Sequence, residues 1–346
     1  MLSNKSVLKI IKKIDPEVRS VNIREFTEAG NINLMYKIST NIHDRAYVLR
    51  GAPNKFDASK YDKEVFLHSL INKKLKIPVP KILFFDKTKK ILPFAYLVME
   101  FKKGDLANNE VKKMNSGERL KLFRELGKNL AKLHSIKFSK YGQIFGDKVS
   151  KYEEKYSKPF DTWKEFYIYS FNNSVQKLSE AKNIKYGKIS KKHFLDLLPK
   201  LEEHLSKNMI RLKSSKKPSL IHDDYRLFNI LVKKNKITAI LDFEMAKAGA
   251  PENELCILPF IWDKNNPLKL TKEGKAFIKG YAKISEKEVI NYRKVYVPLS
   301  LFMEISYDFY HELKYKEAPQ VMSDYYNSIR YVLGLINLKD FKSQAL

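Results

Sequence analysis

Three polar side chains, Asp224, Asn229 and Asp242, flank the apolar segments in the middle of this 346-residue chain. Their spacing is D-x4-N-x12-D. Amide and carboxylate oxygens are the ligands that a hard divalent cation such as Mg²⁺ prefers. A further carboxylate beside such an ion can orient a hydroxyl group and accept its proton, which is the arrangement that phosphoryl transfer requires. The spacing therefore predicts a phosphoryl-transfer site, and the alternative is that these residues only cap strands and turns.

The segment between Asn229 and Asp242 is expected to form a β-hairpin, because residues 230–232 and 237–241 are apolar and flank the sequence Lys-Lys-Asn-Lys. Asn tolerates a positive φ, so Asn235 and Lys236 are expected to form a two-residue turn. With that turn Asn229 lies directly opposite Asp242, with Cα atoms about 5 Å apart. The expected register thus brings both candidate metal ligands to one end of the hairpin.

The rest of the chain divides into a strand-rich part and a helical part. Up to about residue 100, period-two alternation and short apolar runs predict five strands around one helix, and after Gly104 the apolar period becomes helical. The strands are expected at residues 18–27, 34–40, 47–50, 81–85 and 94–101, and the helix at 59–73 with Ser59 as its N-cap. Later helices are expected at 118–135, 160–181, 191–207, 272–282, 286–312 (interrupted at Pro298) and 320–337.

Residues 222–231 read His-Asp-Asp-x4-Asn-Ile-Leu and resemble the H-G-D-x4-N-I-L catalytic loop of the aminoglycoside phosphotransferase and choline kinase-like family, relatives of the protein kinases. Residues 240–244, Ile-Leu-Asp-Phe-Glu, resemble its metal segment. The resemblance, over about residues 20–260, implies that Asp224 is the catalytic aspartate, that Asn229 and Asp242 bind Mg²⁺, and that ATP or GTP donates the phosphate.

The resemblance also implies a fold. It predicts a bilobal, protein-kinase-like α+β fold, with a small antiparallel-sheet N-terminal lobe at residues 1–101 that binds the nucleotide. The larger, mainly helical C-terminal lobe is expected at residues 102–346. This second lobe is expected to carry the catalytic loop at 220–232, the metal segment at 240–244 and the acceptor site.

The nucleotide-binding residues follow from the same resemblance. Gly30 and Asn33 lie in a turn similar to the one that covers the nucleotide. Arg50 stands where protein kinases have a lysine, so it is expected to reach the phosphates and to pair with Glu64 on the following helix.

Two further stretches match structural parts of the family. Glu100 and Phe101 belong to a stretch similar to the hinge between lobes, whose backbone hydrogen-bonds the adenine. Residues 126–134 resemble the family's L-G-x5-L-H helix, and we expect His134 to make a helix-end or core hydrogen bond and His222 to brace the catalytic loop.

The chain departs from the family pattern at the catalytic loop. Asp223 replaces the usual Gly, so it either points to solvent or raises the pKa of Asp224 beside it. Ala250 replaces an Asp, and Glu254 stands where another Asp is common. The last two changes are expected to affect loop bracing more than chemistry.

The acceptor is expected to bind between the catalytic loop and the C-terminal helices. Glu304, Asp308 and His311 are spaced to share one helix face, and Arg226 and Glu244 are further candidates. Acidic side chains there would suit a cationic acceptor, such as an aminoglycoside, an amino sugar or a choline-like amine. An ordinary solvated helix face is the alternative.

Composition limits the other classes of function. The net charge is +27, from 66 basic and 39 acidic residues, but only 10 of the basic residues are Arg, the residue that reads base edges most often. The single cysteine, Cys256, excludes a disulfide framework and favours a reducing cytoplasm. Uncharged runs are far shorter than the ~20 residues of a membrane helix, and the first residues lack a signal-peptide pattern. We therefore expect a cytoplasmic protein with a nucleotide and a small molecule as partners.

Two alternatives stay open at this point. Asp223 beside Asp224 would also fit a catalytically weak nucleotide-binding scaffold. The 11 basic and 3 acidic residues of 182–217 would fit a nucleic-acid-binding surface, although no nucleic-acid motif accompanies them.

Overall fold

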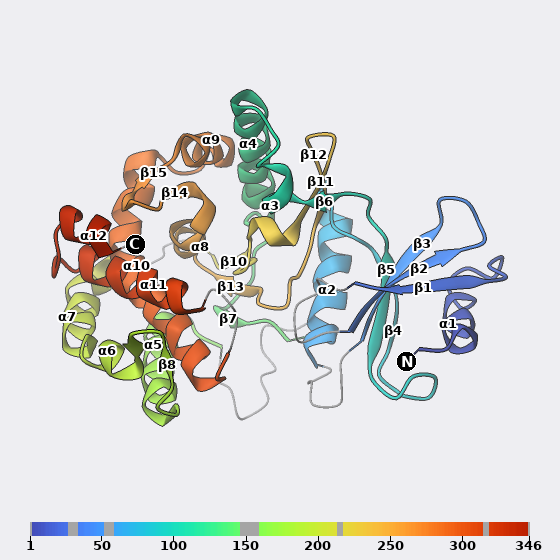
Figure 1. Cartoon of the computed structure of the whole chain (residues 1–346), viewed down its shortest axis with the longest axis horizontal. Coiled ribbons are helices and arrows are strands. Elements are labelled where there is room, and N and C mark those ends of the chain that lie inside the picture. Colours follow the sequence, from blue (N-terminus) through green and yellow to red (C-terminus); the bar gives the residue numbers. More distant parts are fainter. Residues whose placement is uncertain are drawn as a thin grey trace. The chain divides into compact units, whose positions relative to one another are not determined.

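The computed structural model describes residues 2–26, 34–51, 59–145, 159–212, 217–313 and 318–344 (Figure 1). Contacts divide the chain into two compact units, which are described separately. The first unit is made of Met1–Met114, Ile144–Lys151 and Leu227–Met245, and the second of Asn115–Gln143, Tyr152–Arg226 and Ala246–Leu346. The segment with the predicted catalytic and metal-binding residues thus passes from the second unit to the first between Arg226 and Leu227.

An antiparallel sheet with the strand order β1-β2-β3-β5-β4 forms the centre of the first unit. All five strands lie in the predicted stretches or within one residue of them. They are β1 (Val21–Glu25), β2 (Leu34–Thr40), β3 (Ala46–Gly51), β4 (Ile82–Asp86) and β5 (Tyr96–Glu100). The helix α2 (Ser59–Lys74) follows β3 as predicted, but the proposed N-cap contact of Ser59 lies outside the described side chains.

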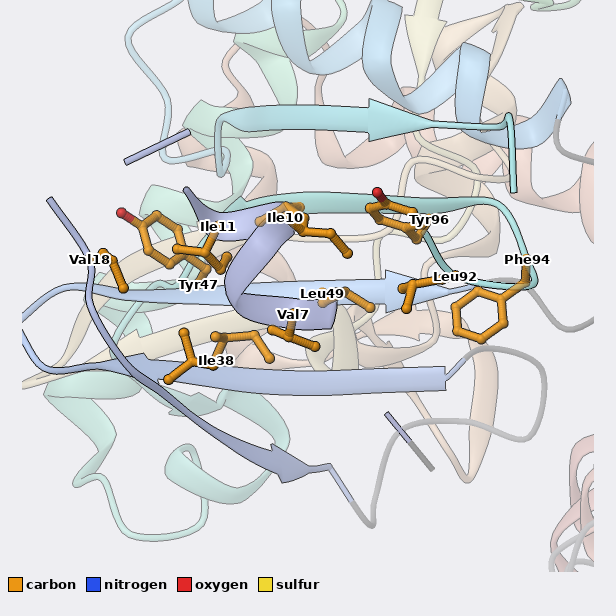
Figure 2. Close-up of a cluster of buried hydrophobic side chains, with 12 residues drawn as sticks. Val7, Ile10, Ile11, Val18, Ile38, Tyr47, Leu49, Leu92, Phe94 and Tyr96 are labelled. Carbon is orange, nitrogen blue, oxygen red and sulfur yellow. The ribbon is translucent and has the colours of Figure 1, made fainter. Parts of the chain in front are cut away.

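One face of this sheet is covered by a helix that the sequence analysis did not predict, α1 (Asn4–Ile11). Figure 2 shows its apolar side chains Val7, Ile10 and Ile11 packed on Leu49 and Tyr96 of the sheet. Because side chains alternate along a strand, the neighbours of Leu49 and Tyr96 belong to a second core cluster on the other face. That cluster contains Val48, Tyr61, Ala95, Leu97 and Met99, and Tyr61 comes from α2. The sheet is therefore buried on both faces, which fixes the position of β3.

A small second sheet in the first unit contains the predicted hairpin, with the strand order β12-β11-β6. Its strands are β6 (Asp105–Leu106), β11 (Ile230–Lys233) and β12 (Lys236–Ile240), and the short helix α3 (Ala107–Glu110) follows β6.

The expected hairpin register is wrong, because the turn lies one residue earlier than expected. It consists of Lys234 and Asn235, both with positive φ (49° and 60°), which is the geometry of a type I′ turn. Lys233 therefore pairs with Lys236, two residues away from the expected register, and a bulge between Leu231 and Val232 reduces the difference to one residue. At the end of the hairpin the N–H of Leu241, not Asp242, faces Asn229, and it donates to the Asn229 carbonyl at 2.8 Å.

The second unit is mainly helical, and α10 (Glu286–Tyr310) is its central helix, in contact with α5, α7, α8 and α11. The helices are α4 (Ser116–Leu133), α5 (Trp163–Glu180), α6 (Lys191–Leu195), α7 (Leu198–Asn208), α8 (Pro251–Ile257), α9 (Lys272–Tyr281), α11 (Ala318–Val332) and α12 (Leu338–Gln344). Pro298 does not interrupt α10, because the surrounding helices bury this stretch and compensate for the lost hydrogen bond. The helix expected at 191–207 is split into α6 and α7.

Short strands complete the second unit. They are β7 (Gly142–Gln143), β10 (Ser219–Ile221) and β13 (Lys247–Gly249), with the order β10-β13-β7, and the hairpins β8 (Lys185–Tyr186) with β9 (Ile189–Ser190) and β14 (Trp262–Asp263) with β15 (Asn266–Leu270).

The Gly of the L-G-x5-L-H stretch serves helix packing. A Cβ atom on Gly127 of α4 would lie 2.1 Å from the carbonyl oxygen of Phe277, and one on Gly280 of α9 would lie 2.0 Å from that of Arg124. Glycine at both positions therefore lets α4 and α9 approach closely.

The two units together confirm the predicted α+β class, with an antiparallel sheet toward the N-terminus and helices toward the C-terminus. Within the described ranges, no helix has the length and apolarity needed to cross a membrane.

Candidate active site

The base of the predicted catalytic loop is held by the buried carboxylate of Glu254, at the start of α8. The backbone N–H groups of His222 and Asp223 donate to its Oε2 and Oε1 atoms, at 3.1 and 2.7 Å. His134 at the C-terminus of α4 lies 2.7 Å from Oε2 through Nε2, and its Nδ1 lies 2.7 Å from the Tyr281 hydroxyl. His134 thus has the structural hydrogen bonds that were expected of it, and Glu254 joins the loop to α4 and α9.

The ionised form of Glu254 is the one that braces the loop. Burial raises the pKa of Glu254. This rise is outweighed by the hydrogen bonds from His134 and from the Asp223 N–H and by the charges of His134 and His222, so the pKa lies below the usual value of 4.5. A carboxyl group with a lowered folded-state pKa stabilises the protein fully above its unfolded pKa. We therefore expect the bracing to be complete at neutral pH and to be lost as the pH falls through the lowered pKa.

Replacing Glu254 by Gln tests this bracing. The amide has one acceptor oxygen in place of two, so one of the two loop N–H groups loses its buried acceptor. We expect a loss of about 2–4 kcal/mol in the free energy of unfolding and a fall in kcat at unchanged affinity for Mg-ATP. Urea unfolding and steady-state rates measure these changes, and Glu202→Gln, on the exposed face of α7, is the control. An unchanged unfolding free energy would contradict the bracing role.

Asp223 is largely buried and does not point to solvent. Its φ of +64° is in the left-handed region, which explains why related loops have glycine there. Its side chain is 13% exposed and lies 2.6 Å from the Nζ atom of Lys247 on β13. Burial raises the pKa of Asp223 and the ammonium of Lys247 opposes that rise. The extra carboxylate therefore has its own cation.

Lys247 was not predicted from the sequence. The residue lies on β13, which pairs with β10 just before the loop, so Ile221 faces Lys247. Only this pairing of strands that are distant in the sequence brings Lys247 to Asp223, and the spacing of residues gave no signal for it.

Asp224, the predicted catalytic residue, belongs to a chain of charged groups in the second unit. Its Oδ1 lies 2.6 Å from Nε of Arg226, and Nη2 of Arg226 lies 2.9 Å from Oε1 of Glu304 on α10. The hydroxyl of Tyr325 on α11 donates to the same Glu304 oxygen at 3.1 Å. The Asp224 side chain is 25% exposed, so a substrate can reach it.

The neighbouring residue anchors this part of the loop. Tyr225 is fully buried, and its hydroxyl donates to the carbonyl of Leu126 in α4 at 3.1 Å. The N–H of Asp224 donates to Nδ1 of His222 at 3.3 Å. The loop backbone on both sides of Asp224 is therefore fixed.

In the first unit the expected ion pair between Arg50 and Glu64 is present and buried. Nη1 of Arg50 lies 2.8 and 2.9 Å from the two carboxylate oxygens of Glu64. Nη2 lies 3.1 Å from Glu244 and 3.8 Å from Asp242. Glu244, which the sequence suggested as an acceptor candidate, thus pairs with Arg50. Burial raises the pKa of Glu64 to about 7 and Arg50 opposes this rise.

Asp242 and Asn229 fit a metal site by their donor chemistry. Asp242 follows β12 with a φ of +61°, and Asn229 precedes β11 at the same end of the hairpin. Within the described residues, the Oδ1 atom of Asp242 is buried without a hydrogen-bond partner, and so is the Nε atom of Arg50. Buried polar atoms are almost always satisfied. The Oδ1 atom of Asp242 is an acceptor that suits Mg²⁺, and the Nε–H group of Arg50 is a donor that suits a phosphate oxygen.

The remaining predicted nucleotide residues are placed as follows. The N–H of Glu100 donates to the Lys81 carbonyl and that of Phe101 to the Ala46 carbonyl, at 3.0 and 3.3 Å. Their two N–H groups are thus used within the sheet. Gly30 and Asn33 lie outside the described residues.

The acidic face expected on α10 is engaged by neighbouring groups. Glu304 pairs with Arg226, as above, and Asp308 is buried at 9% exposure. Glu312 at the end of the helix pairs with Lys182 at 2.6 Å. The helical spacing was read correctly, but the face does not present free carboxylates at Glu304 and Glu312.

Comparison with known proteins shows the family and the fold of this chain. The sequence profile described as the phosphotransferase enzyme family matches residues 23–287. The ADP-bound aminoglycoside phosphotransferase APH(2'')-Ib has a TM-score of 0.62 at 15% identity, over 95% of this chain and 99% of its own. A thermostable mutant of APH(4)-Ia in a ternary complex with AMP-PNP and hygromycin B has a TM-score of 0.58 at 14% identity, over 93% and 98%. At these identities the likeness shows the fold, which is that of the aminoglycoside kinases.

One curated relative is much longer than this chain. The protein named "Probable acyl-CoA dehydrogenase IBR3" from Arabidopsis thaliana is 23% identical over 234 residues, which are 66% of this chain and 26% of that protein. This chain therefore matches about a quarter of the plant protein's length.

Proposed function

We propose that this chain, which belongs to the phosphotransferase enzyme family, is a small-molecule kinase that acts on a hydroxyl group, with ATP bound with Mg²⁺ as its phosphate donor. The first unit would bind the nucleotide and the second would bind the acceptor. Among the fold relatives, APH(2'')-Ib holds ADP and APH(4)-Ia holds AMP-PNP, which supports an adenine nucleotide over GTP. The single cysteine supports action in the reducing cytoplasm.

Two open polar atoms support the donor site. The buried Arg50 has an Nε–H without a hydrogen-bond partner among the described residues, and this group would donate to a phosphate oxygen while Glu64 holds the guanidinium in place. Asp242 and Asn229 would hold the metal. When bound, Mg²⁺ neutralises phosphate charge, which lowers the barrier to attack by a hydroxyl group.

In the second unit Asp224 would orient the acceptor hydroxyl and accept its proton. Its loop is fixed by Glu254 and Tyr225, so little reorganisation is needed when the acceptor binds. Arg226 would hold the Asp224 carboxylate in position. The adenine ring would lie along residues 100–101, where the carbonyl groups are the candidate contacts.

The braced loop with Asp224 is the observation that carries the proposal, and the Asp223–Lys247 pair adds to it. Asp223 had suggested a weak scaffold, because a second carboxylate would crowd the catalytic one. Since Asp223 is buried against Lys247, that reason for a scaffold no longer holds.

A transfer screen tests the proposed function. We expect γ-labelled ATP with Mg²⁺ to label at least one member of a panel of sugars, hydroxy acids, amino sugars and choline-like amines. EDTA should abolish labelling, and γ-labelled GTP should label less. Binding of Mg-ATP in a thermal-shift assay without transfer to any acceptor or to water would favour the scaffold instead.

A further inference from the structure

A half-buried lysine in the second unit, Lys177, forms no ion pair with any residue that the structure describes. Lys177 lies on α5, and its Nζ atom is 6.0 Å from the ring centre of Tyr307 and 5.7 Å from that of Tyr310, both on α10. Within the described part of the chain, no carboxylate forms an ion pair with Lys177. Burial lowers its pKa, because partial removal from water disfavours the charged form. A cation kept in such a place is a candidate for binding an anion.

The surroundings of Lys177 suit a ligand. Tyr307 and Tyr310 are 39% and 40% exposed, so their hydroxyl groups and ring faces can be reached. The ring of His311 lies against that of Tyr307, with 4.2 Å between the ring centres. Tyrosine hydroxyls can donate to an anion, and the rings can cover the apolar part of a small molecule.

The position of this cluster relates it to the catalytic loop. Tyr307 and His311 follow Glu304 by one and two helical turns on the same face of α10. Along the helix axis, Tyr307 lies about 4.5 Å and His311 about 10 Å from Glu304. Glu304 binds Arg226, which in turn holds Asp224. Lys177 is therefore on the same side of α10 as the catalytic aspartate.

The carboxylates on this side of α10 are engaged, whereas no acid in the described residues is paired with Lys177. Glu304 shares Arg226 with Asp224, Glu312 pairs with Lys182, and Asp308 is buried. Among the described residues, Lys177 is therefore a cation on this side that forms no ion pair. The net charge of +27 also raises the local concentration of small anions.

We propose that Lys177, with Tyr307 and Tyr310, binds an anionic group of the acceptor, so that the acceptor is a hydroxy compound that also carries a carboxylate or a phosphate. This inference rests on the proposed kinase function and names its substrate class. It differs from the cationic acceptor predicted from sequence, which becomes the competing outcome of the test.

Equilibrium binding tests the subsite without catalysis. The probes are pairs that share one skeleton, namely hydroxycarboxylates with their amides and sugar phosphates with the free sugars, together with an aminoglycoside and choline. We expect at least one anion to bind about tenfold or more tightly than its uncharged analogue. Lys177→Met should remove that preference, whereas Lys177→Arg should keep it. Lys294→Met, at an exposed lysine of the same α10, is the control.

The outcomes separate this inference from the kinase function. Stronger binding of the aminoglycoside or choline, no preference for anions in the panel, or an unchanged preference in Lys177→Met would each overturn the inference. Transfer of labelled phosphate to the bound anion would support both proposals. Anion binding that depends on Lys177, with no transfer from Mg-ATP to any compound, would leave the subsite standing and refute the kinase function.

Discussion

Replacement of Asp224 by alanine is expected to abolish phosphate transfer while the affinity for Mg-ATP stays within about twofold of wild type. A positioned base contributes about 10²–10⁴ to the rate, and the same carboxylate also orients the hydroxyl. We therefore expect kcat to fall at least about 1,000-fold. We expect the nucleotide affinity to be kept, because Arg50, Glu64 and Asp242 are the candidate nucleotide and metal residues and all three stay in place in this variant.

Single-turnover transfer to an accepted hydroxyl compound, or to water, measures this effect, and calorimetry gives the Kd of Mg-ATP. Asp224→Asn keeps the shape of the side chain and should be nearly as inactive, because an amide does not accept the proton. Arg226 keeps Glu304 as a partner in both variants, so the loop should stay folded. Asp196→Ala, at an exposed aspartate of the same unit, should be fully active. Transfer at the wild-type rate by Asp224→Ala would refute the assignment.

Local patterns predicted the sheet well and the helix α1 poorly. The five strands follow from alternation within each strand, which is visible in the sequence and matches the two buried faces of the sheet. The eight residues of α1 offer only Val7, Ile10 and Ile11 as an apolar stripe. A helix this short is not stable alone, and its stability comes from packing on the sheet.

Turn position and non-local contacts account for what the sequence did not predict at the site. The turn at Lys234 and Asn235 begins one residue earlier than expected, and the bulge between Leu231 and Val232 recovers only part of the difference, which no residue type in the strand signals. The pairing of Lys247 with Asp223 depends on the contact of β10 with β13. Residue types and spacing were enough to identify Asp224, Asn229 and Asp242 as candidates, whereas their charged partners come from distant segments.

The family resemblance predicted the partner of Arg50 correctly but did not predict the partner of Glu244. The expected pair of Arg50 with Glu64 formed because both residues point to the interior from β3 and α2. Glu244 lies two residues after Asp242, and the segment that follows β12 brings both carboxylates to Nη2 of Arg50. A motif therefore predicted the identity of the polar residues better than it predicted which partner each of them takes.

Replacement of Asp242 by alanine is expected to remove the Mg²⁺ dependence of ATP binding. In the wild type we expect ATP to bind at least about 100-fold more tightly with Mg²⁺ than without it, because Asp242 supplies a charged oxygen ligand. The open Oδ1 atom of Asp242 is the group that the metal would satisfy. Without that carboxylate, both forms of ATP should bind equally weakly, through Arg50 and the sheet.

Calorimetric titration with ATP, in Mg²⁺ and in EDTA, measures this change without relying on turnover. The variant should fold, because Arg50 keeps its ion pairs with Glu64 and Glu244 when Asp242 is gone. Asp105→Ala removes an exposed carboxylate from β6, beside the same hairpin, and should bind Mg-ATP like the wild type. If Asp242→Ala still distinguished Mg-ATP from free ATP by the wild-type factor, the metal would have to be held by other residues, and the open oxygen of Asp242 would need another explanation.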